Sequence, residues 1–283
     1  MLTEHPARWL AVLGGALALV PAAGCPAPEP ASPEPGIADV FELSALRQQV
    51  ANVGENVRSG LALRRPYFSQ EQFAIAEQIA GERFAPSALE ARVRDQLAEN
   101  AASEHIAPVV EWLRTPLGRR LIESVNHTYS PEAAEEMKEF VDDRRANPPT
   151  QVRLDLVERY DAAANSAEIS AKLLLLAALT GNIMVNALEP RADRLAPEQL
   201  IESVDNQYQL LQPVFVETAS IQTQMMLQEF SDADVSSLVL FSESAHGKWY
   251  HHVTAAALLD AIEESAIEME QVYLADLGTQ PAS

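Results

Sequence analysis

The chain has 283 residues, of which 47% are hydrophobic and 11 are glycine, so it is long enough for one large domain or two ordinary ones with a packed core. Its formal net charge is −21, from 20 basic and 41 acidic residues, which argues against nucleic-acid binding and against a polybasic contact with anionic lipid. Cys25 is the single cysteine, so an intramolecular disulfide is excluded.

The N-terminal residues have the pattern of a targeting segment. An apolar run, Trp9–Ala22, follows Arg8 and is too short to span a membrane comfortably. Small residues followed by Cys25 resemble the bacterial lipobox, in which the chain is cut before the cysteine and its thiol is acylated. We therefore expect a lipoprotein-type signal peptide over residues 1–24, with lipidation at Cys25. The alternative is ordinary secretion with cleavage near Ala23.

A tether rich in proline and glutamate follows. Residues 25–36 contain the sequence PAPEPASPEPG, which favours extended polyproline conformations that span about 3 Å per residue and cannot bury a core. The residue after Cys25 is proline rather than aspartate, which resembles lipoproteins sorted to the outer membrane. We therefore expect a location in the bacterial cell envelope, at the outer membrane and facing the periplasm, with the lipid bilayer as a partner.

Helix signals dominate the chain from Ile37 to the boundary at Asn147-Pro148-Pro149. Apolar residues recur at helical spacing, and Ser-x-x-Gln/Glu or Thr/Ser-Pro pairs mark several helix starts. Ser69 with Gln72, Ser87 with Glu90, Thr115-Pro116 and Ser130-Pro131 are these starts. The predicted helices cover about Ile37–Leu63, Gln70–Arg83, Ala88–Asn100, Ser103–Leu113, a segment opening at Thr115-Pro116, and Glu132–Arg145.

The second part of the chain gives the same reading. Two consecutive prolines end helical continuation at 148–149, and no segment has a convincing strand period. The predicted helices cover Gln151–Thr180 with a stop at Gly181-Asn182, Ile183–Leu188, Pro197–Gln212, Pro213–Phe230, Asp232–Glu243 capped by Ser231 and Asp234, and Ser244–Leu277. The sequence therefore predicts an all-α fold without a β-sheet: a bundle or array of two related halves, 37–147 and 148–278, and a disordered tail, 279–283.

Two segments share one plan. Residues 106–122, IAPVVEWLRTPLGRRLI, and 235–251, VSSLVLFSESAHGKWYH, each have an apolar run closing on an aromatic residue, then a hydroxyl residue, a glycine and a base. Long amphipathic helices, Glu42–Leu61 and Asp155–Leu174, precede them. The pattern predicts a diverged internal duplication. The structural-motif residues are Trp112, Thr115, Pro116 and Gly118 in the first copy and Phe241, Ser244 and Gly247 in the second.

Glycine inside a helix costs about 1 kcal/mol relative to alanine, so its use at Gly118 and Gly247 needs a reason. We expect the close approach of a neighbouring helix, with the two aromatic residues packed beneath the turn. The functional alternative is a helix N-terminus that presents backbone N–H groups and Arg119, Arg120 or Lys248 to an anion.

The first motif resembles the core of the domain-of-unknown-function 2059 family. The resemblance implies an exported, all-helical bacterial protein, and the family supplies no catalytic residues to carry over. The second copy has Ala245 in place of the proline. The matching residues are Val110, Trp112, Leu113, Thr115, Pro116, Leu117, Gly118, Arg119 and Leu121, and, in the second copy, Leu238, Phe241, Ser244, Gly247 and Lys248.

A metal site is not expected. Glu243-x-x-His246 places a carboxylate and an imidazole on one helical face, as in di-iron bundles, but the folded part has no second pair of this kind. His251 and His252 are nearby, and we expect histidines at the surface or at its boundary. No cofactor and no catalytic residue is predicted, because no nucleophile elbow, phosphate loop or metalloprotease motif is present.

An acidic ladder lies on the last predicted helix at Asp260, Glu264 and Glu268, with Glu263 and Glu270 beside it. Like charges at this spacing repel one another modestly. The pattern is typical of a solvated face, and the alternative is a contact for a basic protein partner.

We therefore predict a non-catalytic role in binding, scaffolding or envelope maintenance. The alternative is a carrier that encloses an apolar or amphipathic ligand between the halves, lined by Met225, Met226, Phe215 and Leu179. A third reading is a metal-dependent enzyme around Glu243 and His246. The apolar run from Leu173 to Leu179 predicts a buried core helix.

Overall fold

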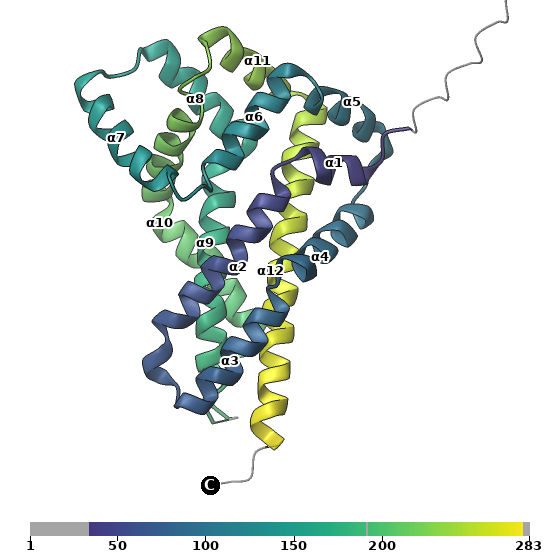
Figure 1. Cartoon of the computed structure of the whole chain (residues 1–283), viewed down its shortest axis with the longest axis vertical. Coiled ribbons are helices and arrows are strands. Elements are labelled where there is room, and N and C mark those ends of the chain that lie inside the picture. The colour runs from purple at the N-terminus through teal and green to yellow at the C-terminus, as the bar shows by residue number, and fades with distance from the viewer. Residues whose placement is uncertain (1–33, 191, 280–283) are drawn as a thin grey trace, which may run out of the picture. The chain divides into compact units, whose positions relative to one another are not determined.

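A computed structural model describes residues 34–190 and 192–279 (Figure 1). These residues contain helices and no β-strand, so the predicted all-α class is confirmed. The compact body begins at Pro35. The predicted signal peptide, Cys25, nearly all of the tether and residues 280–283 lie outside the described residues.

The described helices follow one another with short connections. Predicted caps are confirmed at α3, where Ser69 and Gln72 form a capping box, and at α11, where Ser231 and Asp234 form another. The helices before the double proline are α1 (Ile37–Leu43), α2 (Leu46–Leu63), the 3-10 turn η1 (Arg65–Tyr67), α3 (Gln70–Arg83), α4 (Pro86–Glu99), α5 (Ser103–Leu113), α6 (Pro116–His127) and α7 (Ala133–Ala146). Those after it are α8 (Gln151–Ala164), α9 (Ser166–Asn186), α10 (Pro197–Met226), α11 (Asp232–Glu243) and α12 (Ala245–Thr279).

Two long predicted helices are each broken once. The first breaks at Ser44, whose hydroxyl donates to the carbonyl oxygen of Phe41 (3.1 Å) and accepts from the Leu46 N–H (3.4 Å). Such side-chain bonds compete with the helical ladder. The second breaks at Asn165, which has a left-handed conformation (φ 52°), a conformation that asparagine tolerates better than most residues. Single helices over 37–63 and 151–180 were therefore wrong predictions.

Two predicted breaks are absent, because α9 continues through Gly181 and α10 continues through Pro213. Gly181 does not end α9 because it packs against α2. A Cβ at this position would lie 3.0 Å from the carbonyl oxygen of Gly60. Asn182 also stays in the helix and accepts a hydrogen bond from Arg64 Nε (2.7 Å). Packing between helices therefore overrides the local stop signal.

Two predicted N-caps were also wrong. Ser87 lies inside α4, which begins with Pro86 at its first position. Ser130-Pro131 precedes the start of α7 at Ala133. Proline is favoured at the first helical position because it has no N–H group that would need a hydrogen-bond partner. At α4 it therefore starts the helix one residue before the predicted serine cap.

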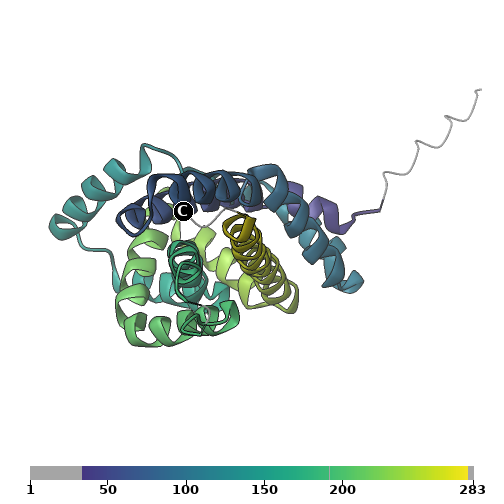
Figure 2. The same cartoon turned by 90° about the horizontal axis from the view of Figure 1, so that it is seen from below.

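One core joins the two sequence segments. Helix α12 packs along α3, α4 and α9, and α2 packs along α9. Figure 2 shows the blue helices of the first segment in a layer above the green and yellow helices of the second. Segments 37–147 and 148–278 therefore belong to one compact unit. The largest fully buried side chains include Phe41, Leu61, Phe84, Leu97, Ile183, Met184 and Tyr273.

Among the described helices, α9 alone is long and apolar enough to cross a membrane by length and composition. The core helix of a soluble protein can meet the same criteria. In α9 the side chains of Leu176, Ile183 and Met184 are buried in the shared core. One face of the helix therefore lies in the core, as expected for Leu173–Leu179, whereas Leu174 on the other face is 54% exposed.

The Tyr273 hydroxyl gives the first testable prediction. Tyr273 is fully buried, its hydroxyl has no hydrogen-bond partner among the described residues, and burial raises the pKa of Tyr273 to about 12. Because an unpaired buried hydroxyl is unfavourable, Tyr273→Phe should raise the free energy of unfolding by about 1 kcal/mol. Thermal unfolding checks this. The matched control is Tyr67→Phe at a position that is 66% exposed, and an equal effect of both variants would contradict the argument.

Candidate functional site

The first sequence motif forms a tight corner between α5 and α6. Thr115 is the N-cap of α6, and Pro116 is its first residue. The Gly118 N–H donates to Thr115 Oγ1 (3.0 Å), and the Thr115 hydroxyl donates to the carbonyl oxygen of Trp112 (2.7 Å). A Cβ on Gly118 would lie 2.4 Å from that same carbonyl oxygen. Only glycine therefore lets α6 start against the last turn of α5.

The second motif forms a corner of the same geometry between α11 and α12. The Gly247 N–H donates to Ser244 Oγ (3.0 Å), and the Ser244 hydroxyl donates to the carbonyl oxygen of Phe241 (2.6 Å). A Cβ on Gly247 would lie 2.0 Å from the Phe241 carbonyl oxygen. At both corners the backbone that approaches the glycine belongs to the helix directly before it.

The aromatic residues of the two corners stack on each other. The ring centroids of Trp112 and Phe241 are 3.7 Å apart with an interplanar angle of 5°. The two motifs, far apart in sequence, therefore meet at one joint. The sequence had placed each ring beneath its own turn and gave no signal of the contact between them.

In the alternative of an anion site, groups that would bind the anion already have partners within the protein. The N–H of Gly118 already donates to Thr115, and Arg120 points to the loop between α10 and α11. There Arg120 donates to the carbonyl oxygen of Glu229 (3.1 Å), lies 3.6 Å from Asp234 and covers the ring of Phe230. These contacts support the packing interpretation of the corner.

A second arginine holds the same loop from the other side. Arg153 of α8 donates to the carbonyl oxygens of Leu227 and Phe230 and to a carboxylate oxygen of Asp232. Its side chain is only 14% exposed, and charge-assisted bonds of this kind are about twice as strong as neutral ones. The loop 227–231 is therefore fixed between two cations.

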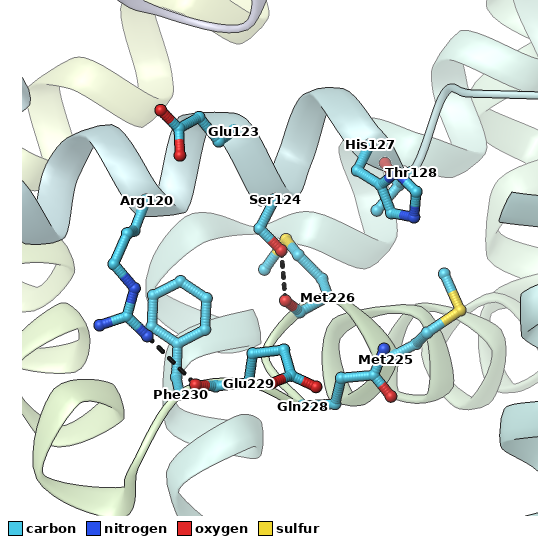
Figure 3. A pocket seen from close by; sticks show the side chains of 10 residues that line it. All are labelled: Arg120, Glu123, Ser124, His127, Thr128, Met225, Met226, Gln228, Glu229 and Phe230. Atoms are coloured by element: carbon cyan, nitrogen blue, oxygen red, sulfur yellow. Dashed lines mark hydrogen bonds between the residues drawn. The ribbon is translucent and has the colours of Figure 1, made fainter.

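Two open hollows flank this loop. The first, of about 340 Å³, lies between α6 and the end of α10 and is shown in Figure 3. In it Ser124 donates to the carbonyl oxygen of Met226, and Arg120 reaches Glu229. The second, of about 500 Å³, lies beyond Phe230 against α7 and includes Arg144 and Arg153. Both volumes are within the range of small-molecule sites.

The four residues predicted to line a carrier cavity are not brought together. Met225 and Met226 line the first hollow. Leu179 is buried in the shared core, and Phe215 packs beside Tyr208 on α10. Of the four residues predicted to line one cavity, only Met225 and Met226 therefore do so, and Phe230 lines the same hollow.

The predicted Glu243–His246 pair is divided between two partners. Glu243 accepts two hydrogen bonds from Arg159 (2.8 and 3.0 Å), which lowers the pKa of Glu243. His246 Nδ1 lies 2.9 Å from His105 Nδ1, and His105 stacks on Trp249. In residues 34–190 and 192–279, no group of three His, Cys, Asp or Glu side chains is arranged around a metal-sized site.

His251 is partly buried rather than at the surface. Its Nε2 lies 3.0 Å from Ser242 Oγ, and the rings of Tyr160 and Tyr250 pack beside it. Burial lowers the pKa of His251 to about 4 and raises the pKa of both tyrosines. This boundary position is one of the two expected for the histidines, but the sequence did not show which face of α12 meets α8.

The acidic ladder has basic partners within the chain. Glu268 lies 2.5 Å from Arg92 and 3.4 Å from Arg83, and Glu264 lies 3.4 Å from Arg92. Burial and the charge of Glu264 raise the pKa of Asp260. The ladder therefore joins α12 to α3 and α4.

In comparisons with known proteins, no family model, no curated protein and no solved structure matches the chain. The resemblance of the corner motif to the domain-of-unknown-function 2059 family therefore stays a prediction.

The corner glycines give a second prediction. Gly118→Ala should lower the free energy of unfolding by about 2 to 3 kcal/mol, because the new methyl group meets backbone that cannot move alone. Gly81→Ala is the matched control, since a Cβ at Gly81 meets nothing within 4 Å and should stabilise α3 by about 0.5 to 1 kcal/mol. Denaturant unfolding measures both. Equal stability of the two variants would contradict the steric reading of the corner.

His251 gives a third prediction, on pH. Its pKa of about 4 in the folded chain lies below the unfolded value of about 6.5, so the unfolded chain binds the extra proton between these values. Stability should therefore fall as pH drops from about 6.5 to about 4, by about 3 kcal/mol from this residue. His251→Gln, whose amide nitrogen can still reach Ser242, should remove this part of the pH dependence. His252→Gln, at an exposed position, should keep it, and urea unfolding at both pH values decides.

Proposed function

We propose that the chain is an envelope lipoprotein whose helical body works as a non-catalytic scaffold or binding module. The observation that carries this proposal is the position of the single cysteine. Cys25 follows the apolar run Trp9–Ala22 and precedes a Pro/Glu-rich stretch, and the compact body begins directly afterwards, at Pro35. A lipid anchor on a short tether would present this body to partners at the outer membrane, on its periplasmic side.

The hydrogen bonds that the candidate polar side chains make support a non-catalytic role. Glu243 is paired with Arg159, His246 with His105, and His251 with Ser242. Catalytic sets need acids, bases and nucleophiles that converge on one site, whereas these groups bond in separate structural contacts. For the same reason we do not propose the metal-dependent enzyme around Glu243 and His246.

We also propose that the two corners are copies of one ancestral unit. Phe241 lies 129 residues after Trp112 (241 − 112 = 129), and the same shift relates Thr115 to Ser244 and Gly118 to Gly247. Under a two-fold arrangement, contacts should exchange between the copies. The stacked pair of Trp112 and Phe241, which are equivalent residues, is what an axis of this kind would produce.

Two further contacts support the duplication. The same shift relates His105 to Asp234 and Arg120 to Trp249. His105 stacks on Trp249, and Arg120 lies 3.6 Å from Asp234. The contact between His105 and Trp249 and the contact between Arg120 and Asp234 thus join equivalent positions with the two copies exchanged. The first contact is an aromatic stack and the second is an ion pair.

A carrier function has weaker support. Met225 and Met226 line a hollow of about 340 Å³, and methionine suits adaptable apolar sites. The hollow is open and has Arg120, Glu123 and His127 in its lining, so it fits an amphipathic ligand better than a purely apolar one.

Acylation of Cys25 is tested by metabolic labelling with an alkynyl fatty acid, followed by membrane fractionation. The natural chain should carry the label and sediment with the outer membrane, whereas Cys25→Ser should lose both properties. Ser32→Ala is the matched control within the tether and should keep them. In-cell crosslinking of the natural chain, but not of Cys25→Ser, should then capture envelope partners.

A double variant examines the position of the thiol. Cys25→Ser combined with Ser32→Cys restores one cysteine seven residues later, after Glu29-Pro30-Ala31 in place of Ala22-Ala23-Gly24. We expect no label on this chain. Label on it, or an unlabelled natural chain, would refute the lipobox reading.

A further inference from the structure

The middle of α10 exposes a row of apolar side chains. The exposed fractions are 81% for Leu210, 61% for Val214 and 44% for Leu211. Spacings of three and four residues place them on one face of the helix. Tyr208 and Ala219 are buried on the opposite face. Exposed apolar side chains grouped on one helix face are typical of an interaction surface, and we call these three the α10 ridge (Leu210, Leu211 and Val214).

The segment that carries the α10 ridge is uncharged, and the exposed Glu217 lies directly after it on the same helix face. Residues 206–216, NQYQLLQPVFV, contain no acidic or basic residue, and neither do residues 173–188 of the neighbouring α9 region. Helices α9 and α10 pack along each other (Figure 1). These uncharged segments stand out in a chain with a net charge of −21. A partner that fits the α10 ridge must be apolar and uncharged.

The composition of the α10 ridge decides between the candidate partners. Helices that lie on membranes use lysine and arginine beside their apolar face, and this segment has neither. A basic protein partner finds one carboxylate within residues 206–218, that of Glu217 at the end of the ridge. A second copy of this chain presents the same neutral face, and contact elsewhere would bring two acidic surfaces together.

We propose that the α10 ridge is the interface of a symmetric dimer of this chain. An antiparallel crossing of the two α10 helices places Leu210 against the partner's Val214. The same crossing places Glu217 against the partner's Gln207, whereas a parallel crossing would bring the two copies of Glu217 together. Isologous pairing of this kind is the commonest way in which soluble chains associate. The proposal rests on α10 and is independent of the acylation of Cys25.

In-cell photo-crosslinking of the full chain tests the dimer. A photoreactive residue replaces Leu210, and two differently tagged copies are expressed together. We expect a product of twice the chain mass that carries both tags. The control places the same residue at Leu240, which is 65% exposed on α11, and should give no such product. A Leu210 product with lipid or another protein, or no two-tag product, overturns the proposal.

A charge variant separates the interface from the fold. Val214→Glu in the chain labelled at position 210 should reduce the two-tag product at least tenfold, because it places two carboxylates at the crossing. Its melting temperature should not change, since Val214 is exposed in the single chain. Leu211→Glu provides a second variant should Val214→Glu melt early. Persistence of the product in a folded charge variant overturns the proposal.

Discussion

The contact between each corner glycine and the backbone six residues before it sets the direction of the helices that follow. At Gly118 and Gly247 there is no room for a Cβ, so α6 and α12 start directly on the last turn of the preceding helix. Both corners then present their aromatic residues to the same joint, where Trp112 and Phe241 stack. Helix α12 leaves this joint and runs 35 residues along α9, α3 and α4.

Several of the basic residues join separate elements of this acidic chain. Arg153 and Arg120 fix the loop 227–231, and Arg92 and Arg83 join α3 and α4 to the acidic ladder of α12. Exposed ion pairs contribute little each, whereas the largely buried Arg153 donates charge-assisted hydrogen bonds to the carbonyl oxygens of Leu227 and Phe230. Acidic residues outnumber basic ones by 41 to 20 in the chain, and the uncharged residues 206–216 of α10 differ from this average.

The local chemistry of the chain made several features predictable. Capping pairs such as Ser69 with Gln72 and Ser231 with Asp234 specify helix starts through bonds within four residues, and the sequence identified them correctly. Hydrophobic spacing likewise identified the all-α class. The breaks at Ser44 and Asn165 were missed because one hydroxyl or one left-handed residue within an amphipathic pattern leaves that pattern almost unchanged.

The sequence alone determined which segments are helical and where the glycine motifs lie, because caps, proline and apolar spacing act between near neighbours. Only the tertiary structure decided which groups from distant helices meet. Gly181 is a helix breaker by propensity, yet α9 continues there because α2 lies against it. Glu243 and His246 share one motif, yet Arg159 and His105 draw them into separate contacts. These outcomes depend on contacts between residues far apart in the chain, which short-range spacing does not encode.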